Sequence, residues 1–189
     1  MKELKPAMLM CLLFTLLCGG LYPALVTGLG QALFPHQAGG SLLTAANGQT
    51  VGSALIGQPF TAPGYLWPRP SATADFSYNP MASGGSNLGP TNPALLTAVK
   101  ERIGVLRATG VSGPIPADLV LASASGLDPH LSPAAARLQI PRIAKARGLS
   151  EEMVANLVTS HTEGRQLGLL GAPRVNVLAV NLALDTISR

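Results

Sequence analysis

Charged residues are absent from a long stretch near the amino terminus of this chain. No Asp, Glu, Lys or Arg occurs between Lys5 and Arg69. The first part of this stretch, residues 7–34, is almost wholly apolar, and about 20 such residues suffice to cross a bilayer as a helix. A cleaved signal peptide has a shorter apolar core of about 7–15 residues. We therefore interpret residues 7–34 as a retained transmembrane helix.

The distribution of basic residues around this helix predicts its orientation. Lys2 and Lys5 precede it, against the single acid Glu3, and no Lys or Arg follows before Arg69. Because cytoplasmic flanks carry the excess of Lys and Arg, residues 1–6 are expected in the cytoplasm. Everything after about residue 30 is expected outside, with residues 35–48 as a tether and residues 49–189 as one periplasmic domain.

Small residues recur every four positions within the apolar segment, at Gly20, Ala24 and Gly28. Such a stripe lets a second helix approach closely in a membrane, although small residues are also common in spans that pack against nothing. Gly19, Gly20 and Pro23 are expected to bend or loosen the helix.

Cysteine is absent from the expected periplasmic domain, since Cys11 and Cys18 both lie in the apolar segment. The domain therefore folds without disulfides. Aromatic residues are absent after Tyr78, so the rest of the chain must build its core from Ala, Val, Leu and Ile. The aromatic segment before that point is expected to serve a membrane interface or a partner as well.

The usual catalytic and metal-binding motifs are missing. No lysine follows a glycine, which excludes a phosphate-binding Gly-Lys-Ser/Thr loop, and no Gly-x-Ser-x-Gly elbow occurs. The histidines, His36, His130 and His161, lack zinc-ligand spacing. Asp128 and His130 are close enough in sequence to orient one another, but the proline between them suits a turn equally well.

Basic residues are most frequent between Arg137 and Arg147. This group also contains Arg142 and Lys145 but no aromatic residue, whereas nucleic-acid binding normally combines a basic stripe with aromatics. No nucleic-acid partner is expected. We interpret these basic residues as a solvated helix face near the negative end of a helix dipole.

The chain after the tether has a mixed α/β pattern. Residues 49–56 suit a short strand, and residues 59–93 contain seven prolines and four glycines, so no helix or long strand is expected there. Aromatic residues within this segment indicate an ordered, extended loop with a function. Helices are expected after Asn92-Pro93, after Ser132-Pro133 with a break at Pro141, and after Ser150; strands are expected at 119–122 and 175–180.

Several long motifs in order carry a resemblance to a known family. QTVGSALIGQPF, YLWPRPSA, YNPMASGGSNLGPTNP, IPADLVLASASGLDPHLS, RIAKARGLS and VNVLAVNLALD together resemble the C subunit of the bacterial Kdp potassium-transporting P-type ATPase. The resemblance covers nearly the whole chain, including the single amino-terminal span.

This resemblance implies a non-catalytic accessory subunit of an ATP-driven potassium pump in the bacterial inner membrane. The expected partners are a potassium-conducting subunit, a P-type catalytic subunit, a small single-span subunit and membrane lipid. The phosphorylated aspartate would lie on the catalytic subunit, and this chain has no Asp-Lys-Thr-Gly-Thr. The alternative is an anchored periplasmic enzyme of unknown reaction.

The resemblance also implies a part in binding ATP, because the family's C subunit has been credited with helping the catalytic subunit do so. Ser83, Gly84, Gly85, Ser86 and Gln139 are the candidate nucleotide residues. A glycine-rich segment can cradle an anion through backbone N–H groups, and a tight turn explains it equally. The predicted orientation places these residues outside the cell, where ATP is scarce, and no other cofactor or metal is expected.

The loop that starts at Tyr78 and ends at Pro93 is the candidate surface for contact with the potassium-conducting subunit, as a cap over the ion entrance. Its candidate contact residues are Tyr78, Asn79, Pro80, Ser83, Gly84, Gly85, Ser86, Asn87 and Gly89.

Overall fold

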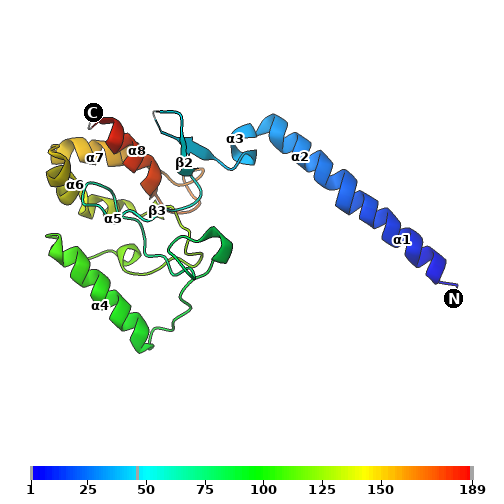
Figure 1. Ribbon diagram of the computed structural model, residues 1–189, viewed down its shortest axis with the longest axis horizontal. Coiled ribbons are helices and arrows are strands. Elements are labelled where there is room, and N and C mark those ends of the chain that lie inside the picture. The colour runs from blue at the N-terminus through cyan, green and yellow to red at the C-terminus, as the bar shows by residue number, and fades with distance from the viewer. Residues whose placement is uncertain (1, 46, 188–189) are drawn as a thin grey trace. The chain divides into compact units, whose positions relative to one another are not determined.

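The computed structural model describes residues 2–45 and 47–187, and the chain forms two compact units, Met1–Leu42 and Leu43–Arg189. The first unit is mainly one helical stretch of 30 residues, Leu4–Leu33 (Figure 1). It contains α1 (Leu4–Leu16), a π-helical segment (Leu17–Leu21) and α2 (Tyr22–Leu33). No residue of these elements is buried, and the stretch is long and apolar enough to cross a membrane.

The π-helical segment interrupts the α-helical hydrogen bonding next to the residues expected to loosen it. It includes Gly19 and Gly20, and Pro23 follows in the first turn of α2. Proline has no N–H to donate to the preceding turn and crowds the carbonyl four residues earlier, and a local π-helical adjustment re-satisfies backbone groups that such a disruption frees. The expectation of a disturbed helix at this position is confirmed.

Regular structure continues into the segment that was expected to be a tether. Residues 35–48 contain the single-turn helix α3 (Pro35–Ala38) and the strand β1 (Leu42–Thr44), which their Gly, Ala and Ser content did not indicate. β1 pairs with β2 (Thr50–Ser53) in a two-stranded sheet. β2 confirms the short strand expected within residues 49–56.

The second unit combines several helices with a small antiparallel sheet (Figure 1). Its strand order is β3-β5-β4, with β3 (His130–Leu131), β5 (Arg174–Asn176) and β4 (Thr162–Glu163). Leu131 pairs with Val175, and Val175 also pairs with Thr162. The helices are α4 (Pro93–Ala108), α5 (Pro133–Leu138), α6 (Ile140–Arg147), α7 (Glu151–Ser160) and α8 (Val177–Ile187). The predicted mixed α/β class is confirmed.

The core of this unit is aliphatic, as the absence of late aromatics predicted. The buried residues that form it are Leu66, Leu106, Leu119, Val120, Leu131, Ala135, Ala136, Ile140, Ile143, Ala144, Val154, Val158, Val175, Val177, Val180 and Leu184. Phe60 and Trp67 are the aromatic side chains that pack against this cluster, and both come from the proline-rich loop.

Helix starts lie where the capping residues predicted them. The side chains of Asn92, Ser132 and Ser150 accept hydrogen bonds from the first-turn N–H groups of α4, α5 and α7. α5 and α6 are separate, with Gln139 between them, as the proline at position 141 predicted. Gly148 ends α6 in a left-handed conformation with φ of 67°, which glycine adopts without steric cost.

Two predicted strands are wrong, one wholly and one in part. Residues 119–122 contain no strand, because a 3₁₀ turn (Ala117–Leu119) ends there. Leu119 and Val120 are nevertheless buried, so their apolar character indicated burial rather than extended structure. The strand predicted at 175–180 ends at Asn176, and α8 begins at Val177. Buried Val177, Val180, Asn181 and Leu184 recur at helical spacing in α8.

Candidate functional site

The proline-rich loop, residues 59–93, is the most distinctive surface of the second unit. Its regular structure is limited to one 3₁₀ turn (Pro80–Ala82) and the start of α4, which confirms the prediction of an extended loop. Leu66, Tyr78 and Asn79 are buried. The loop is therefore part of the folded unit, and its backbone hydrogen bonds must be made without a neighbouring strand.

Two side-chain amides supply the bonds that a neighbouring strand would have made. The Gln139 amide accepts from the N–H of Trp67 at 2.9 Å and donates to the carbonyl of the same residue at 3.0 Å. In the same way, the side-chain amide of Asn181 in α8 accepts from the N–H of Leu66 at 2.8 Å and donates to its carbonyl at 3.1 Å. Both amide side chains are almost fully buried. Consecutive loop residues are thus held from opposite elements through paired bonds, as in a sheet ladder.

Arg142 of α6 binds the same segment next to Gln139. Its guanidinium donates to the carbonyls of Pro63 and Tyr65 and to the side-chain oxygen of Gln139. It also stacks 4.0 Å from the centre of the Trp67 ring, a favourable cation–π arrangement. Burial lowers the pKa of Arg142 to about 10, so the side chain is still cationic at neutral pH.

Arg147, at the end of α6, fixes the beginning of this segment. It donates to the carbonyl of Gly64 and to that of Leu184, and it pairs with Asp185 at 2.8 Å. Its guanidinium lies 4.7 Å from the centre of the Tyr65 ring. The basic residues were interpreted as a solvated helix face. For Arg142 and Arg147 this interpretation is wrong, because each donates hydrogen bonds to loop carbonyls and stacks on an aromatic ring. Lys145 is exposed, as predicted.

We call residues 63–67 the clamped segment. It is held by Gln139, Asn181, Arg142 and Arg147. A buried polar side chain that is fully hydrogen-bonded fixes one backbone conformation, because any alternative leaves buried groups unpaired.

Tyr78 begins the part of the loop that was expected to contact a partner. Its backbone is left-handed, with φ of 63°, and its N–H donates to the Ser71 hydroxyl at 2.9 Å. The phenol donates to the carbonyl of Arg69, and burial raises the pKa of Tyr78 well above its usual value. A Cβ at Gly57 would lie 2.3 Å from the Tyr78 ring, so only glycine fits beneath it.

Asn79 and Pro80 form the turn that follows. The Asn79 side chain accepts from the N–H of Met81 at 3.0 Å and donates to the carbonyl of Ala74 at 3.2 Å. Asn79 is buried, whereas Met81, the middle residue of the turn, is 92% exposed. Asn79 therefore shapes the loop, and the exposed side chain that it presents to solvent is that of Met81, which the sequence analysis did not single out.

The glycine-rich stretch of the loop packs against residues 123–126. The N–H of Gly84 and the hydroxyl of Ser83 both donate to the carbonyl of Ser125, at 2.9 and 3.1 Å. A Cβ at Gly85 would lie 3.0 Å from the carbonyl oxygen of Ala124. Ser86, Asn87 and Gly89 are exposed, and Asn87 is left-handed with φ of 51°.

The candidate nucleotide residues therefore make hydrogen bonds in two different parts of the fold. Ser83 and Gly84 are bonded to Ser125, whereas Gln139 is fully buried and bonded to Trp67 and Arg142. The N–H of Gly84, one of the donors that would face an anion, is occupied by a protein carbonyl.

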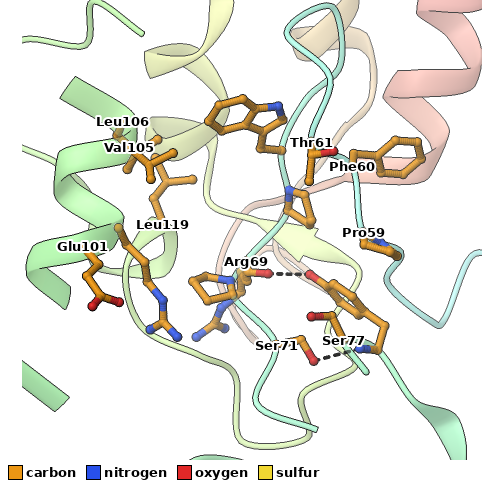
Figure 2. Close-up of a pocket in the computed structure, with 15 residues that line it drawn as sticks. Pro59, Phe60, Thr61, Arg69, Ser71, Ser77, Glu101, Val105, Leu106 and Leu119 are labelled. Atoms are coloured by element: carbon orange, nitrogen blue, oxygen red, sulfur yellow. Dashed lines mark hydrogen bonds between the residues drawn. The ribbon is translucent and has the colours of Figure 1, made fainter. Parts of the chain in front are cut away.

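A cleft of about 510 Å³ lies between the proline-rich loop and α4. Figure 2 shows Val105, Leu106 and Leu119 on one side of it and Pro59, Phe60 and Thr61 on the other. Arg69, Arg102 and Glu101 also line this cleft. Arg102 donates to the carbonyl of Val120 at 2.7 Å, and Arg69 pairs with Asp128 at 2.9 Å. The cleft is mainly apolar, with charged groups at its edge.

Asp128 binds both Arg69, which lines this cleft, and His130, the first residue of β3. Burial opposes ionisation of its carboxyl group, but hydrogen bonds from His130 and Arg69 outweigh it, and the pKa of Asp128 lies below its usual value. The N–H of His130 donates to the Asp128 carboxylate at 3.0 Å, which is the geometry of an Asx turn. The pair therefore shapes a turn, and Nδ1 of His130 also lies 3.5 Å from the Asp128 carboxylate, so both expected relations are present. Within residues 2–45 and 47–187, no cluster of three His, Cys, Asp or Glu side chains is placed to hold a metal.

The chain therefore has one candidate membrane span, followed by a small α/β unit with an ordered proline-rich loop. Residues 4–186 match the family described as "KdpC: K+-transporting ATPase, c chain". The chain belongs to this family.

Full-length relatives agree with this assignment. The chain is 66% identical over 187 residues to the potassium-transporting ATPase KdpC subunit of Geobacter sulfurreducens, covering 99% of each chain. It is 62% identical to the protein of the same name from Geobacter metallireducens, covering 100% of each chain. It is 58% identical to the protein of that name from Methylococcus capsulatus, covering 98% of each. The resemblance inferred from the sequence motifs is confirmed.

Proposed function

We propose that this chain is the accessory, non-catalytic subunit of a potassium-transporting ATPase, anchored in the bacterial inner membrane by residues 7–34. Its family membership carries this proposal. The helix Leu4–Leu33 supports the anchor, since it is apolar along its length and none of it is buried. The partners would be the potassium-conducting subunit, the catalytic P-type subunit and a small single-span subunit, and K⁺ is the ion that the complex carries.

Co-purification tests the assignment directly. The chain carries a tag after Arg189, the host is starved of potassium, and the membranes are extracted in mild detergent. Stoichiometric recovery of a P-type ATPase and a large multi-span subunit is expected. Recovery of the chain alone from cells that express both would contradict the proposal. The anchored-enzyme alternative requires that the purified chain turn over a substrate by itself.

The orientation proposed is residues 1–6 in the cytoplasm and residues 49–189 in the periplasm, joined by the segment 35–48. It is supported by Lys2 and Lys5 ahead of the span and by the lack of any Lys or Arg between it and Arg69. Protease added to spheroplasts should remove the second unit without lysis. Protection until the cells are lysed would reverse the orientation.

The span is proposed to pack against another helix of the pump through Gly20, Ala24 and Gly28. All three are exposed in the structure, and apart from the helix's own neighbouring backbone no described atom lies within 4 Å of a Cβ built at either glycine. Gly28→Leu should reduce recovery of the other subunits, because the larger side chain keeps the partner helix away. Gly30→Leu is the matched control, since two residues farther on it lies outside the stripe. Equal recovery of partners with both variants would remove the stripe from the proposal.

The proline-rich loop is proposed to contact the outer face of the potassium-conducting subunit through its exposed positions. Met81 provides the sharpest test because it is 92% exposed, and a change there leaves the buried Asn79 in place. Met81→Asp should lower complex yield or potassium affinity. Met153→Asp is the control, an equivalent change at a half-exposed methionine of α7. Wild-type behaviour of the Met81 variant in both assays would argue against this surface.

The proposal gives the chain no nucleotide site, because the amide of Gln139 and the N–H of Gly84 already bind protein groups. The resemblance's link to ATP would have to act through the catalytic subunit. Millimolar ATP binding by the purified chain, abolished by Ser83→Ala, would restore a direct role.

A further inference from the structure

The loop between β4 and β5 exposes three leucines that lie close together in the sequence. We call residues 164–173 the leucine loop. Leu167, Leu169 and Leu170 are 91, 79 and 60% exposed. Isolated exposed leucines are ordinary on protein surfaces, but three within four residues at the end of one hairpin form an apolar projection of the kind that marks an interaction site.

The leucine loop satisfies much of its own backbone. The Gln166 N–H donates to the Leu170 carbonyl and the Leu170 N–H donates back, both at 2.9 Å. The N–H groups of Gly168 and Leu169 donate to Arg165 and Gln166 carbonyls, at 3.2 and 3.1 Å. A backbone that enters an apolar phase must carry its hydrogen bonds with it. This closed turn does so for four of its N–H groups.

Basic side chains flank the leucines. Arg165 precedes them, and its guanidinium makes one long bond, 3.5 Å, to the carbonyl of Leu169. It has no acidic partner among the residues that the structure describes. Arg174, where β5 begins, is already paired with Glu163 at 2.7 Å. The loop therefore combines an apolar end with one uncompensated cation, and this combination complements an anionic lipid surface, whose headgroups attract Arg while its acyl region accepts leucine.

The chain tethers the second unit, and with it the leucine loop, to a bilayer if the first unit is the anchor. Residues 34–41 separate α2 from β1, and eight residues extend over at most about 28 Å. Contact between the loop and the membrane is then intramolecular, with an effective concentration in the millimolar range for a short connection. Even weak insertion would be populated under these conditions.

We infer that the leucine loop inserts Leu167, Leu169 and Leu170 into the surface of the membrane that the anchor spans, with Arg165 at the headgroups. A protein partner fits the composition less well, because Arg165 is the only residue of the loop of a type enriched at interface hot spots, and leucine is under-represented among them. The inference rests on the proposed anchor and goes beyond it by giving the second unit its own membrane contact.

Depth-dependent quenching tests this inference on the full chain. In a Cys11→Ser, Cys18→Ser background, Leu169→Cys carries an environment-sensitive NBD fluorophore, and the chain is reconstituted in phosphatidylethanolamine–phosphatidylglycerol vesicles with nitroxide-labelled lipid. Position 169 should lose fluorescence to the nitroxide. Met81→Cys, also highly exposed but on the proline-rich loop, is the control and should lose much less. Adding Arg165→Gln should reduce quenching at position 169 in anionic vesicles and leave it unchanged in neutral ones.

Equal quenching at positions 169 and 81 would overturn the inference. So would a label at 169 that, in the assembled pump, is shielded from both nitroxide lipid and aqueous iodide, because a protein would then cover the loop. Resistance of the chain to alkaline extraction is measured on the same vesicles, so failure of the anchor is distinguished from failure of the loop contact.

Discussion

The clamped segment and the leucine loop are both irregular connections, yet they differ in what supplies their hydrogen bonds. Leu66 in the clamped segment is fully buried, and its backbone binds a side-chain amide of α8. Leu167 in the leucine loop is 91% exposed, and its neighbours bond only within their own turn. An irregular segment becomes part of a core when distant side chains bind its backbone; otherwise it is free to meet another surface.

The largest effect is expected at Gln139, which binds both backbone groups of Trp67. Gln139→Ala leaves the N–H and the carbonyl of half-buried Trp67 without partners, at about 1–3 kcal/mol each, so unfolding should become easier by about 2–6 kcal/mol. Trp67 is the only tryptophan, and its fluorescence reports the transition in denaturant with the full chain in detergent. Arg137→Ala, on the exposed face of α5, is the control. A loss below about 1 kcal/mol would show that the amide is dispensable.

Substitution of Arg142 tests whether its planar shape or its positive charge holds the clamped segment. Arg142→Lys keeps a cation but loses the planar fork and much of the stacking on Trp67, so a loss of about 1–3 kcal/mol is expected. Lys145→Met, an exposed position of the same helix, should change stability by less than about 0.5 kcal/mol. If lysine at 142 preserved wild-type stability in the same denaturant assay, positive charge alone would account for the contact.

Local sequence signals predicted most of the fold, and their failures have a common physical cause. Asn92, Ser132 and Ser150 mark helix starts correctly because capping depends only on adjacent residues. Residues 119–122 and 175–180 were assigned to strands because a short apolar run indicates burial without specifying a helix or a strand. The hydrogen bonds that hold the clamped segment could not be predicted from the sequence, because Gln139 and Trp67 are 72 positions apart.

One signal for the clamp was nevertheless present in the sequence. Asn181 interrupts an otherwise apolar run, VLAVNLAL, and a polar residue inside a buried helix indicates a specific hydrogen-bond partner. The arginines of α6 gave no such signal, because basic residues near a helix end are already explained by the helix dipole. The proposed contact residues of the proline-rich loop and the membrane stripe stay predictions.

A smaller effect is expected from Asp128, which fixes Arg69 at the edge of the cleft. The pKa of Asp128 is lowered in the folded state, so its contribution to stability is complete above the ordinary carboxyl pKa and is lost as pH falls through the lowered value. Unfolding of wild type and Asp128→Asn should therefore differ most near neutral pH and converge in acid. Arg69→Met removes one of the groups that lower the pKa of Asp128. In that background, the stabilities with Asp and with Asn at position 128 should therefore become equal at a higher pH. Parallel profiles would assign the acid sensitivity to other carboxyl groups.

The smallest effect on folding is expected at the leucine loop, and it completes the contrast with the clamped segment. Leu167→Ser, Leu169→Ser and Leu170→Ser combined remove side chains that touch little in the folded unit, so stability in detergent should change by less than about 0.5 kcal/mol. The same denaturant assay with Trp67 fluorescence measures it. A loss comparable to that of Gln139→Ala would mean that the leucines support the fold. Near-neutral stability, together with lost quenching by labelled lipid, would show that these residues act outside the folded unit.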